Sequence, residues 1–391
     1  MKLGSAYRVK ITRVTTYTAS EVIQRPNGVS ISPLTIVSID TDNDISGVAE
    51  ATLETKEKTV AACIMEFEQY LLGKDPLQIE KHWHAMYRGS YWTGGPVINS
   101  AISAIEIALW DIAGKHYDAP IYSLLGGPCR DKVRCYTSTS GNTPEELADN
   151  VEEAMNEGFT AVKFMAYGLN DRMLDAVEDA EKRCKAVREK VGNKVDIMLE
   201  CHGRPSLHLA LSLVQKLHKY RPLWIEEPLF AENIEAMAEL RRHSRIPIAT
   251  GERLFTKWGF RELLEKQVAQ IIQPDPIHCG GILETKKIAA MAEAYYMAVA
   301  PHCPYFLIAL ATALQIDACI PNFIIQEGGR VRGKWLVKEP LQVENGYIRL
   351  PNKPGLGVEV DFNAIEEHPY KPRLNWSPYM TYHEDGSIEE L

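Results

Sequence analysis

The chain has 391 residues, of which 45% are hydrophobic and 24% charged, a globular balance that excludes a collagen, a coiled-coil rod and a wholly disordered chain. Its 43 lysines and arginines face 52 acidic residues, and the net charge of −9 argues against a nucleic-acid partner, because phosphate neutralisation supplies most of that affinity. The length predicts two or three domains, or one large barrel with an accessory domain.

Signals for a membrane or for export are weak. The longest apolar stretch, 101–110, is interrupted by Ser103 and Glu106 and is shorter than the about 20 apolar residues that a membrane span needs. The first residues lack the apolar core of a signal peptide. The eight cysteines form no Cys-x-x-Cys pair, which indicates a reducing compartment. We therefore expect a cytoplasmic protein with no membrane partner.

Residues 1–130 predict a small α+β domain. Asp42-Asn43-Asp44 is a turn signal between two strand-like segments. Gly126-Gly127-Pro128 breaks the pattern and marks the boundary of the domain. The expected strands are 7–17, 35–40 and 47–52, and the expected helices are 56–72 and 99–116.

From residue 131 onward, strand-like and helix-like segments alternate regularly. The strand-like runs follow one another at steps of 23 to 37 residues, and a βα unit of a barrel averages about 30 residues. This spacing predicts a (β/α) barrel over 131–335. The remaining segment, 336–391, is irregular, and we expect it to pack back on the first domain. The eight runs end at Tyr136, Lys163, Glu200, Glu226, Glu252, Asp275, His302 and Glu327.

Three consecutive runs end in a carboxylate, namely Glu200, Glu226 and Glu252. Adjacent barrel strands lie about 4.8 Å apart, so equivalent end positions converge on one mouth. Three carboxylates in one small cleft require a cation, and hard oxygen ligands favour Mg²⁺. The alternative is that they are surface acids at helix N-termini. The equal steps between them favour the metal site.

The next two runs end in Asp275 and His302, which a barrel would place side by side. A carboxylate bonded to one ring nitrogen orients an imidazole and leaves the other nitrogen free for proton transfer. Alternatively, Asp275-Pro276 is only a turn. His202 lies two residues after Glu200 and would face the same cavity, unless it is a loop histidine bonded to backbone. Glu327 and Lys163 end the last and the second run.

These segments together carry a family resemblance. The chain resembles the enolase superfamily, and within its mandelate-racemase branch the galactonate and gluconate dehydratase-like members. The likeness runs through nearly the whole chain. It rests on Glu200-Cys201-His202-Gly203-Arg204-Pro205, Trp224-Ile225-Glu226-Glu227-Pro228, Gly251-Glu252-Arg253, Gln273-Pro274-Asp275, Ala300-Pro301-His302-Cys303-Pro304, Gln326-Glu327, Gly94-Gly95-Pro96, Ala108-Leu109-Trp110-Asp111-Ile112, Leu125-Gly126-Gly127 and Pro354-Gly355-Leu356-Gly357.

The resemblance implies a modified TIM barrel, an α/β fold, with an N-terminal α+β capping domain that the C-terminal tail completes. It implies a hydro-lyase of carbohydrate catabolism in which Glu200, Glu226 and Glu252 hold Mg²⁺ and the metal binds the substrate carboxylate. The catalytic residues would be His302, Asp275, His202, Glu327 and Lys163.

In the implied reaction, the His302–Asp275 pair removes the proton beside the carboxylate, and Mg²⁺ and Glu327 stabilise the resulting enediolate. His202 protonates the departing 3-hydroxyl, and the product is a 2-keto-3-deoxy sugar acid. Lys163 would pair with the substrate carboxylate. The seventh-strand histidine of such enzymes serves an R-configured C2, and a second-strand lysine serves the opposite face.

Two positions depart from the pattern. Glu200 stands where this branch commonly has aspartate, although gluconate dehydratase-like members share it. Met165 stands where racemases carry the second lysine of a Lys-x-Lys, and a thioether cannot abstract a proton. Dehydration is therefore favoured over racemisation. A cycloisomerase or epimerase on the same scaffold, and a catalytically silent barrel that binds an acid sugar, are the alternatives.

The substrate is expected to be a small sugar acid, and the protein a homo-oligomer. The resemblance implies that first-domain loops, here 19–29 and 88–96, close over the barrel mouth and set specificity. Their side chains suit the recognition of a polyol by hydrogen bonds and stacking. The candidates for substrate binding are Arg25, Asn27, Arg88, Tyr91 and Trp92.

Overall fold

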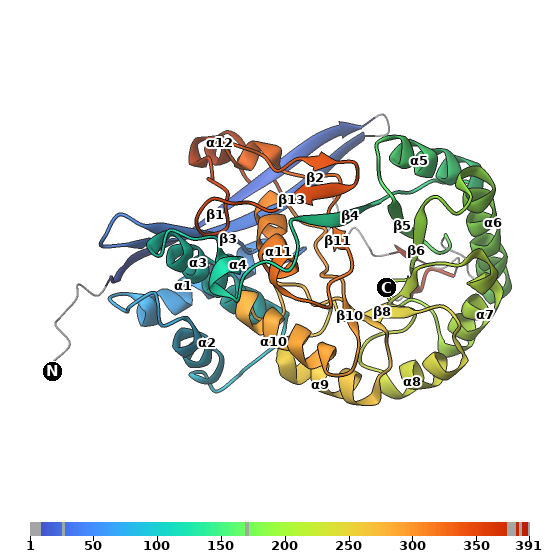
Figure 1. Cartoon of the computed structure of the whole chain (residues 1–391), viewed down its shortest axis with the longest axis horizontal. Coiled ribbons are helices and arrows are strands. Elements are labelled where there is room, and N and C mark those ends of the chain that lie inside the picture. The colour runs from blue at the N-terminus through green and yellow to red at the C-terminus, as the bar shows by residue number, and fades with distance from the viewer. Residues whose placement is uncertain (1–8, 26–27, 169–171, 374–380, 383–384, 390–391) are drawn as a thin grey trace.

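The computed structural model describes residues 9–25, 28–168, 172–373, 381–382 and 385–389. A cap made from the first third of the chain lies beside a ring of parallel strands enclosed by helices (Figure 1). The C-terminal segment runs back between the two parts. The predicted α/β fold with a capping domain is thus the one observed.

The cap contains an antiparallel sheet in the order β1-β2-β3, with helices packed on it. The long β1–β2 hairpin pairs continuously from Arg13 with Asp40 to Arg25 with Gly28. Residues 19–29, which we predicted to form a loop, are therefore largely strand, because each strand satisfies the backbone groups of the other. The elements are β1 (Ile11–Arg25), β2 (Gly28–Thr41), β3 (Ser46–Glu50), α1 (Glu57–Leu71), α2 (Ile79–Arg88), α3 (Pro96–His116) and α4 (Ile121–Leu124).

Helix α3 is the central helix of the cap. It begins with Pro96 after Gly95, whose φ of +80° would strain a residue with a side chain. It contacts β3, α1 and the barrel helix α10 (Ile282–Glu293). Its 21 residues are longer than the apolar stretch in the sequence suggested, and it is the one helix in the described ranges that is long and apolar enough to cross a membrane. Because 83% of its most apolar window is buried inside the protein, it is a core helix.

Eight parallel strands form the ring, and the predicted ends of the runs agree with the observed strand ends to within three residues. In the register between β6 and β7, Glu200 lies beside Glu226. Within the described residues no strand ladder joins β10 to β11; a single bridge, Val299 with Phe323, spans that step. The strands are β4 (Lys132–Ser138), β5 (Ala161–Met165), β6 (Asp196–Glu200), β7 (Trp224–Glu226), β8 (Ile248–Thr250), β9 (Ile271–Ile272), β10 (Ala298–Val299) and β11 (Gln326–Glu327).

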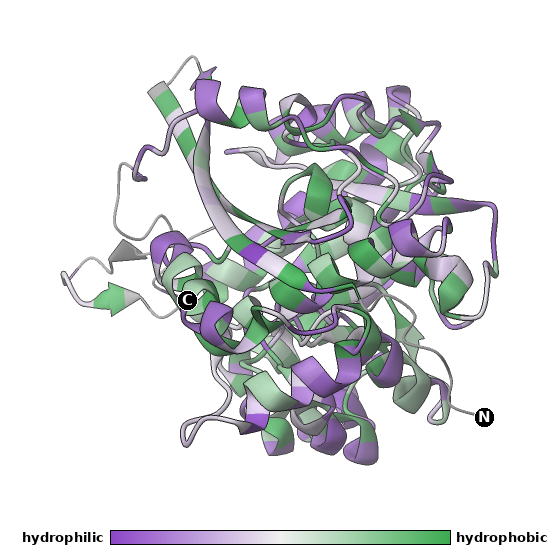
Figure 2. Cartoon of the chain, turned by 90° about the vertical axis from the view of Figure 1, so that its left-hand side faces the viewer, coloured by the Kyte–Doolittle hydropathy of each residue, from purple (hydrophilic) through white to green (hydrophobic). Residues whose placement is uncertain are grey.

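Helices enclose the ring (Figure 1), and the view from the cap side shows polar and apolar segments alternating along the helices that face the viewer (Figure 2). The hydroxyl of Thr143 accepts a hydrogen bond from the Glu146 N–H at 3.1 Å and so caps the helix that begins at Pro144. Helix α11 is buried on all sides because it lies between the ring and the cap. The helices are α5 (Pro144–Asn156), α6 (Met173–Val191), α7 (Leu207–Leu217), η1 (His218–Tyr220), α8 (Ile234–His243), α9 (Thr256–Lys266), α10 (Ile282–Glu293) and α11 (Leu307–Cys319).

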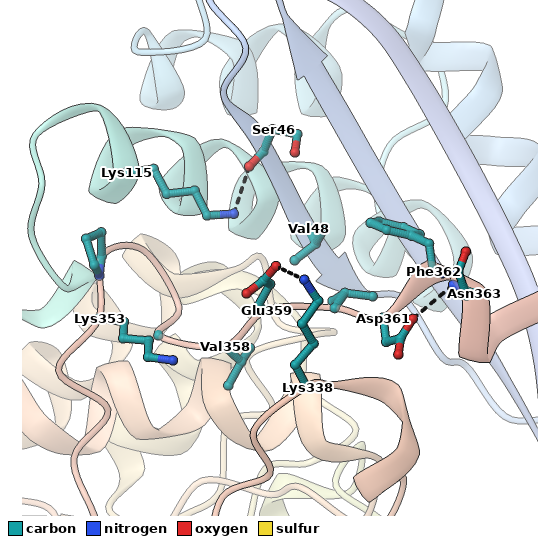
Figure 3. A pocket seen from close by; sticks show the side chains of 13 residues that line it. Ser46, Val48, Lys115, Lys338, Lys353, Val358, Glu359, Asp361, Phe362 and Asn363 are labelled. Atoms are coloured by element: carbon teal, nitrogen blue, oxygen red, sulfur yellow. Dashed lines mark hydrogen bonds and ion pairs between the residues drawn. The ribbon is translucent and has the colours of Figure 1, made fainter.

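The C-terminal segment contacts both parts of the molecule. Strand β13 pairs antiparallel with β4, and the Ser20 hydroxyl of the cap donates to the Lys371 carbonyl. A cavity of about 650 Å³ lies between this segment and the cap, and Lys115 and Lys338 in its wall are held by Ser46 and Glu359 (Figure 3). The elements are η2 (Lys334–Leu336), β12 (Val343–Glu344), β13 (Tyr347–Arg349), α12 (Phe362–Glu367), β14 (Thr381–Tyr382) and β15 (Ile388–Glu389).

Candidate active site

A cavity of about 760 Å³ opens at the carboxyl ends of the barrel strands, where ligands bind in folds of this kind. Barrel residues form most of its wall, and the cap contributes Leu53, Glu54 and Pro96. The sequence-predicted residues that line it are Lys163, Glu200, His202, Glu252, His302 and Glu327. Glu226 is fully buried beside them, so the structure brings together the metal and catalytic candidates.

Glu200, Glu226 and Glu252 form a three-carboxylate cluster. One oxygen from each lies within 4.8 Å of the other two. Ligand oxygens about 2.1 Å from an Mg²⁺ lie roughly 3 to 4 Å from one another, so small side-chain adjustments suffice for this cluster to hold the ion. Burial, and then repulsion by Glu226, raises the pKa of Glu200 well above its usual range. Such repulsion is what a divalent cation removes.

Among the described residues, Lys163 is the cation with the shortest contacts to this cluster. Its Nζ lies 2.6 Å from Glu226, 3.1 Å from Glu200 and 3.1 Å from Glu327. Burial alone would lower the pKa of Lys163, but the surrounding carboxylates, Glu226 foremost, raise it well above its ordinary value. Against its own burial, Lys163 in turn lowers the pKa of Glu226 to about 2. The ammonium is therefore a fixed positive charge at the floor of the cavity.

His302 and Asp275 form the predicted pair. His302 Nδ1 lies 2.7 Å from Asp275 Oδ2, and the other carboxylate oxygen accepts the Ile277 N–H at 2.9 Å. This anchoring leaves His302 Nε2 on the cavity side, 3.6 Å from Glu252. Burial opposes the charged ring, but Glu252 and the bond to Asp275 raise the pKa of His302 well above its ordinary value. The ring has the environment of a proton acceptor.

His202 lies beside Glu200, on a turn that follows β6. Its φ is +52°, a left-handed conformation, and its N–H donates to Glu200 Oε1 at 2.9 Å. The imidazole reaches the cavity with 32% of the side chain exposed. Burial, and then the charge of Lys163, lowers the pKa of His202 to about 4. The two histidines of the site therefore have pKa shifts in opposite directions.

Of the predicted substrate-binding residues, Arg88, Tyr91 and Trp92 are not among the described residues that line the cavity. The Arg88 guanidinium lies over the Trp258 ring at 5.1 Å. Tyr91 and Trp92 stand in solvent, 91% and 77% exposed, with their rings edge to face. Arg25 ends β1, and Asn27 lies outside the described residues. Their role in binding stays a prediction.

Sequence reasoning did not pick out several wall residues. Tyr305 lies beyond His302, and its hydroxyl contacts His278 Nε2 at 2.8 Å and donates to Glu54 at 3.1 Å. His278 also contacts the Ser100 hydroxyl at 2.7 Å. Glu54 and Ser100 belong to the cap, so no local sequence signal places them here. Arg253 also lines the cavity, and its place in the Gly251-Glu252-Arg253 motif is a sequence signal that could have identified it.

Known proteins match both the cap and the barrel of this chain. A family model described as enolase C-terminal domain-like matches residues 146–364, and a model of the mandelate racemase / muconate lactonizing enzyme N-terminal domain matches residues 9–126. A D-galactonate dehydratase from Ralstonia pickettii (strain 12J) is 39% identical over 395 residues, covering 98% of this chain and 100% of the relative.

Solved structures agree with the sequence matches. A mandelate racemase/muconate lactonizing enzyme from Sulfitobacter sp. superimposes with a TM-score of 0.86 at 32% identity, covering 93% of this chain and 96% of its own. A member of the enolase superfamily from Salmonella Typhimurium gives 0.84 at 30% identity, covering 92% and 98%. The chain therefore belongs to the mandelate racemase / muconate lactonizing enzyme family of the enolase superfamily.

Proposed function

We propose that this protein is an Mg²⁺-dependent hydro-lyase that converts a sugar acid of the gluconate or galactonate type into a 2-keto-3-deoxy sugar acid. One observation carries the proposal. His302, bonded to Asp275, and His202 line the same cavity, the first beside Glu252 and the second beside Glu200. Elimination of water next to a carboxylate needs one group to take a proton and another to give one, and the site offers both. The galactonate dehydratase relative supports this reading.

In the proposed reaction, Glu200, Glu226 and Glu252 hold the ion. When bound, Mg²⁺ supplies positive charge that favours the carboxylate substrate and the charge that develops on its oxygens. His302 Nε2 takes the proton from C2, while Asp275 holds the ring and stabilises the imidazolium that forms. The Lys163 ammonium, adjacent to Glu327, adds positive charge where the substrate carboxylate lies.

His202 then gives a proton to the 3-hydroxyl. The C3–O bond breaks, water leaves, and the enol rearranges to the 2-keto acid. A ring with a lowered pKa must first gain its proton, and the negative charge of a bound sugar acid favours that gain. The two steps can be measured separately, because exchange of the C2 hydrogen depends on His302 and formation of the dehydrated product depends on His202.

A screen tests the proposal. The purified protein with Mg²⁺ is incubated with a panel of sugar acids, and 2-keto-3-deoxy products are detected together with exchange of the C2 hydrogen in deuterated water. We expect product from at least one acid of the gluconate or galactonate type. Epimerised substrate without product would instead show an epimerase, a lactone product would show a cycloisomerase, and binding without either would show a silent barrel.

A further inference from the structure

We propose that Arg253 is a positioning residue for His202, because its guanidinium holds the backbone turn that carries the imidazole. The proposal rests on the dehydratase function above, since it concerns the group that protonates the departing hydroxyl. Arg253 follows Glu252 in the chain, and its side chain extends toward the loops that follow β6 and β7. It reaches His202 through the backbone of that residue and not through its ring.

The contacts of Arg253 connect three loops. Its Nη2 donates to the carbonyl of His202 at 3.2 Å, and its Nε pairs with Glu227 at 3.0 Å. The guanidinium also lies over the Phe230 ring, 5.3 Å from the centroid. Glu227 is fully buried, and Arg253 is its one cationic partner among the described residues. The guanidinium thus donates one hydrogen bond to the His202 carbonyl and forms an ion pair with the buried Glu227, so a planar, charged group suits this bridge.

The turn at His202 needs such support. The left-handed backbone at φ +52° is strained for a residue other than glycine. Its N–H is tied to Glu200 at 2.9 Å, and its carbonyl is tied to Arg253. Gly203 follows at φ +76°, and a Cβ there would lie 3.1 Å from Phe230. With the carbonyl released, the peptide after His202 would be held on that side only by the Gly203 N–H, which donates to the Glu227 carbonyl at 2.8 Å.

The imidazole depends on this backbone for its position. Its Nε2 lies 3.8 Å from Glu200 Oε1, which is beyond hydrogen-bond reach. The direction of the ring is therefore set where the side chain leaves the turn. A displacement of about 1 Å at a reacting group can cost about 100-fold in rate. Loss of Arg253 should consequently impair proton delivery at the 3-hydroxyl and leave proton removal at C2 largely unchanged.

The test uses Arg253→Met in the Mg²⁺-loaded protein with the best sugar acid of the panel. We expect kcat for product formation to fall about 10- to 100-fold, C2 hydrogen exchange to stay within about threefold, and KM to change little. The decisive substrate is the matching 3-deoxy-3-fluoro acid. Fluoride leaves with the C3–F electron pair and needs no proton, so the variant should release fluoride at close to the parental rate. His202→Ala should show the same pattern.

The controls separate the other readings. Arg261→Met, an exposed arginine on α9, should match the parent in every assay. Arg253→Lys keeps the charge but not the planar guanidinium, so it should lose less of the kcat for product formation and still release fluoride at close to the parental rate. It also serves as the test if the methionine variant does not fold.

Equal losses with hydroxyl and fluoro substrates, or loss of C2 exchange, would overturn the proposal and place Arg253 with the metal or His302. A rise in KM alone would make it a substrate ligand. A parent without any product would refute the proposed function instead.

Discussion

At the scale of single residues, the site combines many carboxylates with few cations. Lys163 contacts Glu200, Glu226 and Glu327 at once, and all four side chains are buried. Its position explains why Glu226 ionises easily while Glu200 does not. One ammonium cannot neutralise the whole cluster, since Glu252 points toward His302 instead. The cluster is suited to a second, divalent charge.

This imbalance leads to a prediction about metal binding. Chelation should abolish activity, and Mg²⁺ should restore it best. Glu226→Gln should weaken Mg²⁺ binding at least about tenfold, because it removes a charged ligand and leaves Lys163 without its closest partner. Isothermal titration calorimetry of the purified variant measures the affinity without reference to turnover. Normal metal affinity and normal turnover in Glu226→Gln would show that the site is elsewhere.

A second prediction concerns the base. His302→Asn should abolish exchange of the C2 hydrogen with deuterated solvent, because the amide cannot accept the proton although it can still reach Asp275. Nuclear magnetic resonance of the recovered substrate measures the exchange. His208→Asn, on the outer helix α7, is the matched control and should exchange at the parental rate. Exchange that persists in His302→Asn would move the base to another residue, with Lys163 the first to be considered.

At the scale of elements, buried glutamates of the cap bind the N-termini of two barrel helices. Glu106 of α3 accepts the N–H groups of Ile282 and Leu283 at 2.7 and 2.9 Å at the start of α10. Glu50 of β3 accepts those of Phe306 and Ala309 at 3.3 and 3.1 Å at the start of α11. The first N–H groups of a helix have no partner within it, so these carboxylates join the cap to the barrel.

The Glu106 contact also depends on a glycine. Gly281 precedes α10 at φ +94°, and a Cβ at that position would meet Glu106 Oε2 at 2.1 Å. Despite the N–H donors, burial raises the pKa of Glu106 to about 8. The folded protein therefore keeps this proton to higher pH than the unfolded chain does. Unfolding releases the proton between about pH 4.5 and 8, so this carboxyl destabilises the fold as the pH rises through that window.

Glu106→Gln should remove this pH dependence. The amide of the variant has one acceptor oxygen where the carboxyl of the parent has two, so the variant should unfold at a lower temperature than the parent near pH 5.5. This difference in Tm should narrow as the pH approaches 8. The free energy of unfolding of the parent should change by at most about 1.4 kcal/mol per pH unit, which corresponds to roughly 2–4 °C in Tm for a domain of this size. Thermal unfolding followed by circular dichroism across this range measures it. Glu366→Gln, at an exposed site on α12, should keep a constant gap, and a constant gap in Glu106→Gln would contradict the argument.

At the scale of the whole molecule, the cap completes the wall of a cavity that barrel residues mostly form. Tyr305 of the barrel and Glu54 of the cap share a hydrogen bond in its wall, and His278 and Ser100 continue the contact into α3. The barrel provides the reacting groups on separate strands, so each face of a bound substrate meets different chemistry. His302 follows β10, whereas Met165 ends β5 on another part of the ring.

This asymmetry predicts the stereochemistry of the substrate. With His302 as base and no lysine at Met165, accepted acids should share the 2R configuration, as gluconate and galactonate do, and the C2 epimer mannonate should fail. The measurement is kcat/KM for epimeric pairs, and we expect a difference of at least about 100-fold. Met165→Lys is an informative companion, because a base on the second face should allow C2 exchange from the other epimer. Efficient turnover of mannonate with little activity on gluconate or galactonate would refute the assignment of faces.

Much of this protein follows from its sequence. The regular spacing of apolar runs predicted the barrel, because each βα unit needs a similar length of chain to cross the sheet and return. The same spacing placed Glu200, Glu226 and Glu252 at strand ends, and motifs around them indicated the family. Asp275 and His302 were paired by the same logic, and their ring nitrogen and carboxylate are in contact at 2.7 Å. Each of these features is set by a short stretch of the chain, so the sequence of that stretch is enough to predict it.

The tertiary structure decided what depends on contacts between distant segments. The hairpin through 19–25 is strand because β2 pairs with it, and α3 is a core helix because the cap sheet and α10 cover it. Lys163 faces three glutamates only once four strands are aligned. Arg253 reaches the carbonyl of His202, 51 positions earlier, across loops whose shape no local pattern specifies. Burial and long-range hydrogen bonds set these positions, and both are properties of the folded chain as a whole.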